Sequence, residues 1–182
     1  MSTKHKSQRV AVLVDVQNLY HSAKNLYGAR VNFANLLKEI TGGRQLIRAI
    51  AYVVKSDEPG EINFFEALSR AGLEIRSKDL QIYPDGLKKA DWDVGMAVDA
   101  IRLSNIVDVV VLVTGDGDFI PLVEYLKAKG CQTELAAFGK TANSRLKEIA
   151  DDFADFDNRP DIFLIRSNSK IKRGIIPFKI NR

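Results

Sequence analysis

Short apolar segments alternate with segments of helical spacing along most of this chain, and this alternation narrows its fold more than any other feature. The first apolar segment, residues 10–14 (VAVLV), is continuous, which is typical of a strand buried on both faces of a parallel sheet. Residues 33–40 instead repeat apolar side chains every three or four positions, as an amphipathic helix does. Parallel strands need crossover connections, so the pattern predicts an α/β fold: a three-layer, Rossmann-like parallel sheet with helices on both faces.

The expected elements follow one another along the chain in this alternating order. Strands are predicted at residues 10–14, 46–54, 73–82, 107–113 and 132–137, with 162–165 as one further candidate. Helices are predicted at residues 18–27, 33–40, 62–71, 93–105, after residue 118 as far as 129, and at 143–150. Asn32 is the expected N-cap of the second helix, and Gly42 its stop. Residues 83–86 are expected to form a turn, and residues 167–182 are expected to be loosely structured.

Charge is distributed unevenly and suggests three segments, a basic tail at 1–8, a domain at 9–158 and a basic extension at 159–182. Residues 1–9 carry three basic and no acidic residues, and residues 159–182 carry seven basic residues and one acid. The 17 basic and 22 acidic residues between them give that part of the chain a net charge of −5, although the whole chain is at +4. Basic ends on an acidic body favour a polyanionic partner. The alternative is that the ends only aid solubility.

Several features point to a cytoplasmic protein with no membrane segment. Cys131 is the single cysteine, so no disulfide forms within the chain. No apolar run approaches the roughly 18 residues of a membrane span, and the first ten residues have no apolar core of a signal peptide.

Four aspartates stand near the ends of strands that we expect at the centre of the sheet. Asp15 ends the first strand, Asp116 and Asp118 follow the fourth, and Asp93 begins the helix before the fourth. If these two strands are neighbours, the four side chains converge on one crevice at the carboxyl edge of the sheet. Two carboxylates about 4 Å apart repel by roughly 4 kcal/mol at an effective dielectric constant of 20, so the group needs a cation or a proton. All-oxygen ligands favour Mg²⁺ or Mn²⁺, and two histidines with one cysteine disfavour a zinc site.

Each carboxylate also has a simpler explanation. Asp118 and Asp93 are suited to cap the helices that follow them, and Asp15 is suited to stabilise a turn. Gly115 and Gly117 predict unusual backbone conformations that let a ligand approach. The loop has no lysine where a P-loop places one, so a bare phosphate cradle is disfavoured.

Three ordered motifs resemble one known family. VLVDVQN (12–18), KKADWDVGMAVDA (88–100) and VLVTGDGDF (111–119) are similar to those of the NYN domain, the LabA-like branch of the PIN-like nucleases. The resemblance extends over roughly residues 9–158. It implies a PIN-like sheet whose acidic site binds Mg²⁺ or Mn²⁺ and cleaves RNA.

The resemblance also assigns roles to individual residues. It implies that the catalytic metal ligands are Asp15, Asp93, Asp116 and Asp118, and that supporting residues are Asn18, Asp91, Asp99 and Thr114. Thr114 stands where the family commonly has serine and keeps the hydroxyl. Asp99 and Asp93 lie about 240° apart around a straight helix, so both cannot face one metal. The alternative for Asp99 is an ion pair with Arg102.

Substrate binding has to come from other side chains because the body is acidic. The candidates are Lys88, Lys89, Lys140, Arg145 and Trp92. The lysines and the arginine would contact phosphates of single-stranded RNA, and Trp92 would stack on an unpaired base. Packing of Trp92 against a neighbouring loop is the alternative.

Two other classes of function stay open at this stage. The chain could be an adaptor with weak or no catalysis, binding RNA or protein, with residues 175–178 (IIPF) as a docking segment for a partner or a second copy. The same carboxylates could instead serve a Mg²⁺-dependent hydrolase of a small phosphorylated metabolite.

Overall fold

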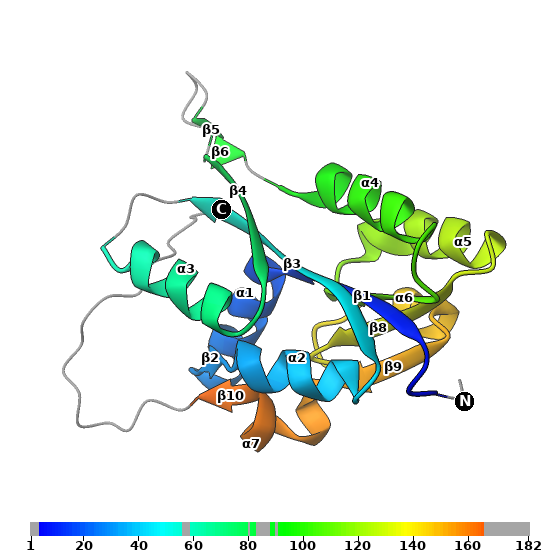
Figure 1. Cartoon of the computed structure of the whole chain (residues 1–182). Coiled ribbons are helices and arrows are strands. Elements are labelled where there is room, and N and C mark those ends of the chain that lie inside the picture. Colours follow the sequence, from blue (N-terminus) through cyan, green and yellow to red (C-terminus); the bar gives the residue numbers. More distant parts are fainter. Residues whose placement is uncertain (1–3, 56–58, 80, 83–87, 90, 166–182) are drawn as a thin grey trace.

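Six parallel strands form the central sheet (Figure 1). The computed structural model describes residues 4–55, 59–79, 81–82, 88–89 and 91–165, with the backbone alone at 81–82 and 88–89. The strand order across the sheet is β4 (Glu74–Asp79), β3 (Gln45–Lys55), β1 (Arg9–Asp15), β7 (Val109–Val113), β8 (Gln132–Ala137) and β9 (Asp152–Asp155).

Helices cover both faces of this sheet, which confirms the three-layer α/β fold. One face packs against α1 (Val16–Tyr27), α2 (Phe33–Thr41), α3 (Glu61–Arg70) and α7 (Pro160–Phe163). The other packs against α4 (Asp93–Leu103), α5 (Ile120–Ala128) and α6 (Ser144–Ile149). Asn32 caps α2 through its side chain and Gly42 ends it in the left-handed conformation, both as predicted. Short pieces complete the fold: β2 (Arg30–Val31) pairs with β10 (Leu164–Ile165), β5 (Gln81–Ile82) pairs with β6 (Lys88–Lys89), and 3₁₀ turns occur at η1 (Gly117–Phe119) and η2 (Phe156–Asn158).

The continuous apolar sequence of β1 reflects burial on both sides. Val10, Val12 and Val14 point into the core under α1 and α2. Ala11 and Leu13 point into the core under α4 and α5. All five are fully buried, so a strand that alternates polar and apolar residues could not occupy this position.

The strand order reverses between β1 and β7, and this reversal positions the site. From β1 the chain moves outward to β3 and β4, whereas from β7 it moves outward in the opposite direction to β8 and β9. Connections diverge at such a point and leave a crevice beyond the carboxyl ends of the two strands. The first strand and the strand before Thr114 are neighbours, which meets the condition under which the sequence places the four aspartates in one crevice.

The elements predicted from the sequence differ from the structure in several places. The segment 162–165 is a short helix followed by a two-residue strand, because Phe163 ends α7 and its carbonyl accepts the Asn32 N–H. The sixth strand, β9, was not predicted. The segment 73–82 forms two strands rather than one. The predicted turn at 83–86 and the tail at 167–182 lie outside the described residues. No helix among the described residues is long and apolar enough to cross a membrane.

Candidate metal centre

Three carboxylates meet at the crevice between β1 and β7. Asp93, Asp116 and Asp118 each offer one oxygen, and these three oxygens all lie within 4.8 Å of one another. Asp93 is the first residue of α4, and the other two belong to the loop that follows β7. Asp118 is exposed and the other two are half-buried, so the group is open to solvent on one side.

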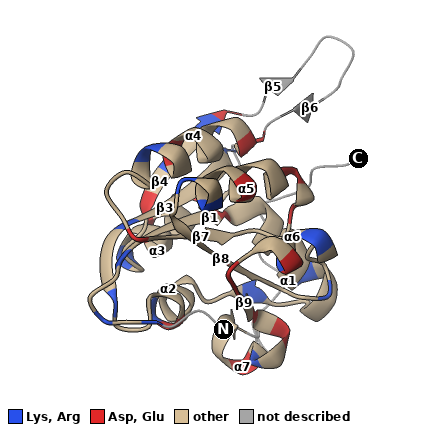
Figure 2. Ribbon diagram, turned by 90° about the vertical axis from the view of Figure 1, so that its right-hand side faces the viewer, with Lys and Arg blue, Asp and Glu red and all other residues tan. Residues whose placement is uncertain are grey.

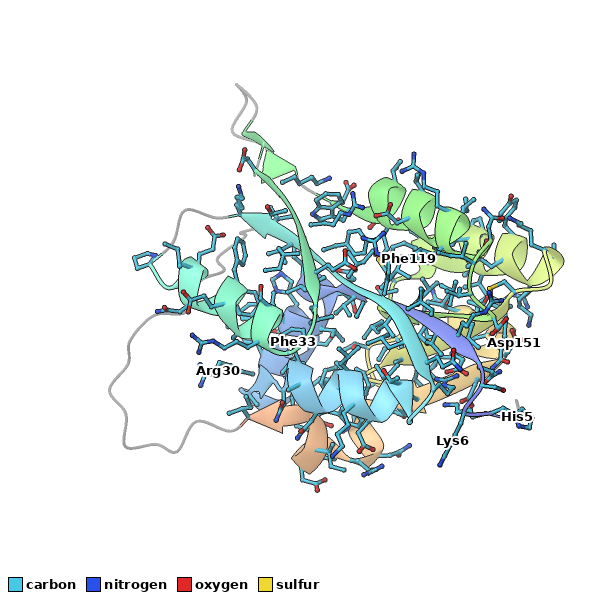
Figure 3. All side chains as sticks on the ribbon, in the orientation of Figure 1. His5, Lys6, Arg30, Phe33, Phe119 and Asp151 are labelled. Carbon is cyan, nitrogen blue, oxygen red and sulfur yellow. The ribbon has the colours of Figure 1, made fainter. Side chains whose placement is uncertain are left out.

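The loop after β7 owes its shape to its own aspartate. Asp116 has extended backbone geometry and its Oδ1 accepts the Asp118 N–H at 3.0 Å, which starts η1. Phe119 ends this turn and is buried in the core that α4 and α5 share (Figure 3). The buried ring anchors the loop, so both carboxylates are held close to their positions before any ligand arrives.

Asp15 lies beside this group but outside it. It is the N-cap of α1, where its Oδ1 accepts the Asn18 N–H at 3.1 Å. Its Oδ2 accepts the Thr114 hydroxyl at 3.1 Å. Both oxygens are therefore engaged by the protein, and the local structural role that the sequence allowed for Asp15, the stabilising of a turn, takes the form of an N-cap. The structure brings three of the four predicted ligands together and leaves the fourth outside their group.

Burial and charge act together on Asp15 and Asp93. The pKa of Asp15 is raised from 3.8 to about 6, mainly by burial and less by the carboxylates of Asp93 and Asp116, against the lowering effect of its hydrogen bonds. Burial also raises the pKa of Asp93, as do Asp91, Asp116 and Asp118, while Lys78 lowers it. Both shifts mark negative charge that the surrounding protein leaves uncompensated.

Asn18 and Thr114 join the two sides of the crevice. The Asn18 Oδ1 accepts the Gly115 N–H at 2.9 Å, so α1 holds the start of the loop after β7. The Thr114 Oγ1 accepts the Asp116 N–H at 3.2 Å while donating to Asp15. These two polar side chains fix the backbone that carries Asp116.

The glycines of the loop are required for close packing rather than for unusual backbone angles, which corrects the expectation from the sequence. Neither Gly115 nor Gly117 is among the glycines with positive φ. A Cβ on Gly115 would lie 2.9 Å from the Cα of Ala142, and a Cβ on Gly117 would lie 2.5 Å from the side-chain nitrogen of Asn143. The loops after β7 and β8 therefore touch at these two positions.

Asp99 points away from the three carboxylates. It is buried, and its Oδ2 accepts the Tyr52 hydroxyl at 2.9 Å and lies 3.4 Å from Arg76 Nε. Arg102, its predicted partner, is at 4.0 Å. Asp99 thus contacts β3 and β4 rather than the three carboxylates, which agrees with its separation from Asp93 around the helix. These contacts favour a structural role between α4 and the sheet.

Trp92 is packed into the protein. Its indole N–H donates to the Val53 carbonyl at 2.8 Å, and its ring centroid lies 5.4 Å from that of Tyr52. A Cβ on Gly95 would come within 2.7 Å of the ring, and Lys78 lies over it at 5.0 Å. These contacts favour the packing role over stacking on a base.

The other predicted substrate contacts are spread over separate elements. Lys140 is exposed in the loop after β8 with its Nζ 5.5 Å from the centroid of the Tyr27 ring, and Arg145 on α6 lies 3.9 Å from Glu148. Lys88 and Lys89 form β6, and their side chains lie outside the description. Figure 2 shows the described acidic and basic residues interspersed along the ribbon.

The donor set fits a hard divalent cation. The group of three consists of carboxylates alone, and Mg²⁺ and Mn²⁺ prefer oxygen ligands.

Comparisons with known proteins agree with this architecture. A family model for the NYN domain matches residues 9–163. The chain is 23% identical over 164 residues to the low amplitude and bright protein LabA of Synechococcus elongatus, covering 84% of this chain and 86% of that protein. A crystal structure of a protein of unknown function from Vibrio parahaemolyticus superposes with a TM-score of 0.81 at 32% identity, covering 90% of this chain and all of that one. The family model covers most of the chain, which therefore belongs to the NYN domain family.

Proposed function

We propose that this chain is a metal-dependent ribonuclease that hydrolyses RNA phosphodiester bonds at the Asp93, Asp116 and Asp118 cluster. The observation that carries the proposal is the convergence of three carboxylate oxygens within 4.8 Å at the strand-order reversal. Membership of a nuclease family supports the same activity.

The three carboxylates would hold Mg²⁺ or Mn²⁺, and Asp15 would lie beside them as a fourth negative charge. A bound divalent cation supplies Lewis acidity toward a phosphate oxygen and lowers the pKa of an attacking water. The protein's own part is to hold the carboxylates in position. Asn18 and Thr114 fix the loop that carries Asp116, and Asp15 ties Thr114 to the start of α1.

A cation at this cluster also explains how an acidic body could accept a polyanion. Without one, Asp118 is exposed beside two half-buried carboxylates and repels phosphate. With one, the same position attracts it. Single-stranded RNA is the proposed substrate, and Lys88, Lys89, Lys140 and Arg145 stay candidates for contacts to its phosphates.

The test is cleavage of a labelled single-stranded RNA with Mn²⁺ or Mg²⁺, and again with a chelator. Asp116→Asn keeps an oxygen that can accept the Asp118 N–H, so the loop should keep its shape. We expect it to lose at least ~100-fold in cleavage rate, since changes even behind metal ligands cost about 10–100-fold.

Asp155→Asn is the matched control. Asp155 also caps a 3₁₀ turn, η2, through the Asp157 N–H at 2.9 Å, but it does not belong to the cluster. Its variant should cleave like the unmodified chain. RNA cleavage that persists with a chelator or in Asp116→Asn contradicts the proposal. Binding without cleavage would favour the adaptor, and release of phosphate from a phosphomonoester would favour the metabolite hydrolase.

A further inference from the structure

Lys78 lies on β4, and its contacts differ from those of the other basic residues of β3 and β4. Arg48 forms a bidentate ion pair with Glu74, Arg76 lies 3.4 Å from Asp99, and Lys55 lies 3.7 Å from Asp79. Within the described part of the chain, Lys78 has no such pair, and its ammonium group lies 5.0 Å from the centroid of the Trp92 ring.

The ring under Lys78 cannot move easily. Trp92 is fixed by its hydrogen bond to the Val53 carbonyl, by contact with Tyr52 and by the close approach of Gly95 in the first turn of α4. A cation on a fixed aromatic face is attracted by the negative electrostatic potential of the ring and keeps its full charge. The charge is therefore placed in advance and is not cancelled by a carboxylate.

Its position relative to the acidic cluster is set by the sheet. Lys78 lies near the carboxyl end of β4, which is two strand spacings, about 10 Å, from β1. Trp92 directly precedes Asp93, a member of the cluster, and the charge of Lys78 lowers the pKa of Asp93. The ammonium group thus flanks the cluster on the β4 side.

We infer that Lys78, held on Trp92, binds a backbone phosphate of the RNA next to the bond that is cut. The inference rests on the proposed function and adds a substrate-binding residue to it. A phosphate beyond the one at the cluster is present in a polynucleotide and absent from a phosphomonoester, so this contact favours a polymeric substrate. It also gives Trp92 a role other than base stacking, which is to position a lysine.

The test measures RNA affinity with cleavage blocked. Binding of a fluorescent single-stranded RNA to the full chain is measured in Ca²⁺ over a series of salt concentrations. Lys78→Met keeps an unbranched side chain on the ring but removes the charge. We expect weaker binding and a slope of log K against log salt that is smaller by about 0.7, the value for one phosphate contact to a single strand.

Lys129→Met is the matched control. Lys129 also lies over an aromatic ring, Tyr125, at 5.9 Å, but it follows α5 at the amino edge of the sheet. The same loss of charge there should leave the slope unchanged, and Lys78→Arg should retain it. Equal melting temperatures of the variants exclude a general loss of structure.

The outcomes separate this inference from the proposed function. An unchanged affinity and slope in Lys78→Met overturns the inference, even if the chain cleaves RNA. A reduced slope in a chain that binds but does not cleave RNA supports the inference while overturning the nuclease. An unmodified chain that does not bind RNA overturns both.

Discussion

Asp15 shows how one buried carboxyl group links stability to metal binding. Its pKa in the folded protein is about 6 against an ordinary value of 3.8, mainly because of burial. A raised pKa means that folding favours the protonated form, so the stability associated with this group is full below about pH 4 and is lost as the pH rises through 6. The metal-free protein is therefore expected to lose stability over this range, and a cation at the cluster is expected to oppose that loss.

Asp15→Asn should stabilise the metal-free protein at neutral pH. Asparagine is a good N-cap and can still accept the Asn18 N–H, whereas it carries no charge. The shift of about two pKa units corresponds to at most ~3 kcal/mol in the free energy of unfolding. Urea unfolding with a chelator at about pH 7.5 and about pH 4.5 measures this gain, which should be larger at the higher pH.

The control and the contradicting result for this variant are both simple. Asp155→Asn makes the same chemical change at a cap outside the cluster and should not show the gain. Added Mg²⁺ or Mn²⁺ should stabilise the unmodified chain more than Asp15→Asn. An Asp15→Asn protein that is less stable than the unmodified chain at neutral pH contradicts this account of Asp15.

At the scale of elements, strands that are buried on both faces were predictable and the edge of the sheet was not. β1 and β7 are continuous apolar runs bounded by polar residues, because both of their faces lie under helices. β9 has the sequence DFAD and four half-buried residues. Aspartate is depleted in strands, so such a segment forms a strand only because β8 offers it a partner.

The candidate site was predictable to the extent that it depends on strand ends. Asp93, Asp116 and Asp118 were expected together because their elements meet at one edge of the sheet, and the structure places them together. Asp15 lies outside this group and makes two hydrogen bonds, a local N-cap bond to the Asn18 N–H and a bond from the Thr114 hydroxyl across the β1–β7 crevice. No sequence pattern encodes the second of these bonds. Lys78 was missed because its contact with Trp92 joins a strand to the residue before a distant helix.

The contact between the loops after β7 and β8 gives a prediction at this scale. Gly115→Ala places a Cβ 2.9 Å from the backbone of Ala142, which can move only with its loop. Overpacking of this kind typically costs about 1–3 kcal/mol. The displaced loop carries Asp116, so cleavage should fall together with stability. Thermal unfolding and RNA cleavage measured on the same variant check this.

In Gly117→Ala the added Cβ would clash with a side chain, whereas in Gly115→Ala it would clash with backbone. The Cβ added at Gly117 meets the side chain of Asn143, which also caps α6 by accepting the Leu146 N–H at 3.1 Å. Asn143→Ser keeps a capping oxygen on a shorter side chain and should restore the stability of Gly117→Ala. The same replacement should not restore Gly115→Ala, where the obstacle is backbone. Equal rescue of both variants would contradict the assigned contacts.

At the scale of the whole molecule, the charge of the chain is divided between a body and its ends. The part between residues 10 and 158 carries a net charge of −5, whereas residues 166–182, which lie outside the described part of the chain, contribute six basic residues and no acid. A cation at the cluster neutralises charge only locally. We therefore propose that the basic residues of 166–182 increase the affinity for RNA, while the cluster determines the rate of cleavage.

Replacing the six basic residues of 166–182 by glutamine in the full chain separates these two contributions. Each lost phosphate contact to single-stranded RNA lowers the slope of log K against log salt by about 0.7, so the slope should fall by up to about 4. The cleavage rate at saturating RNA should stay the same because no metal ligand has changed. Replacing Lys170, Lys172 and Lys179 by arginine keeps the charge and should keep the affinity. A lower cleavage rate at saturation, with affinity unchanged, would instead mean that these basic residues act on the site itself rather than on the encounter with RNA.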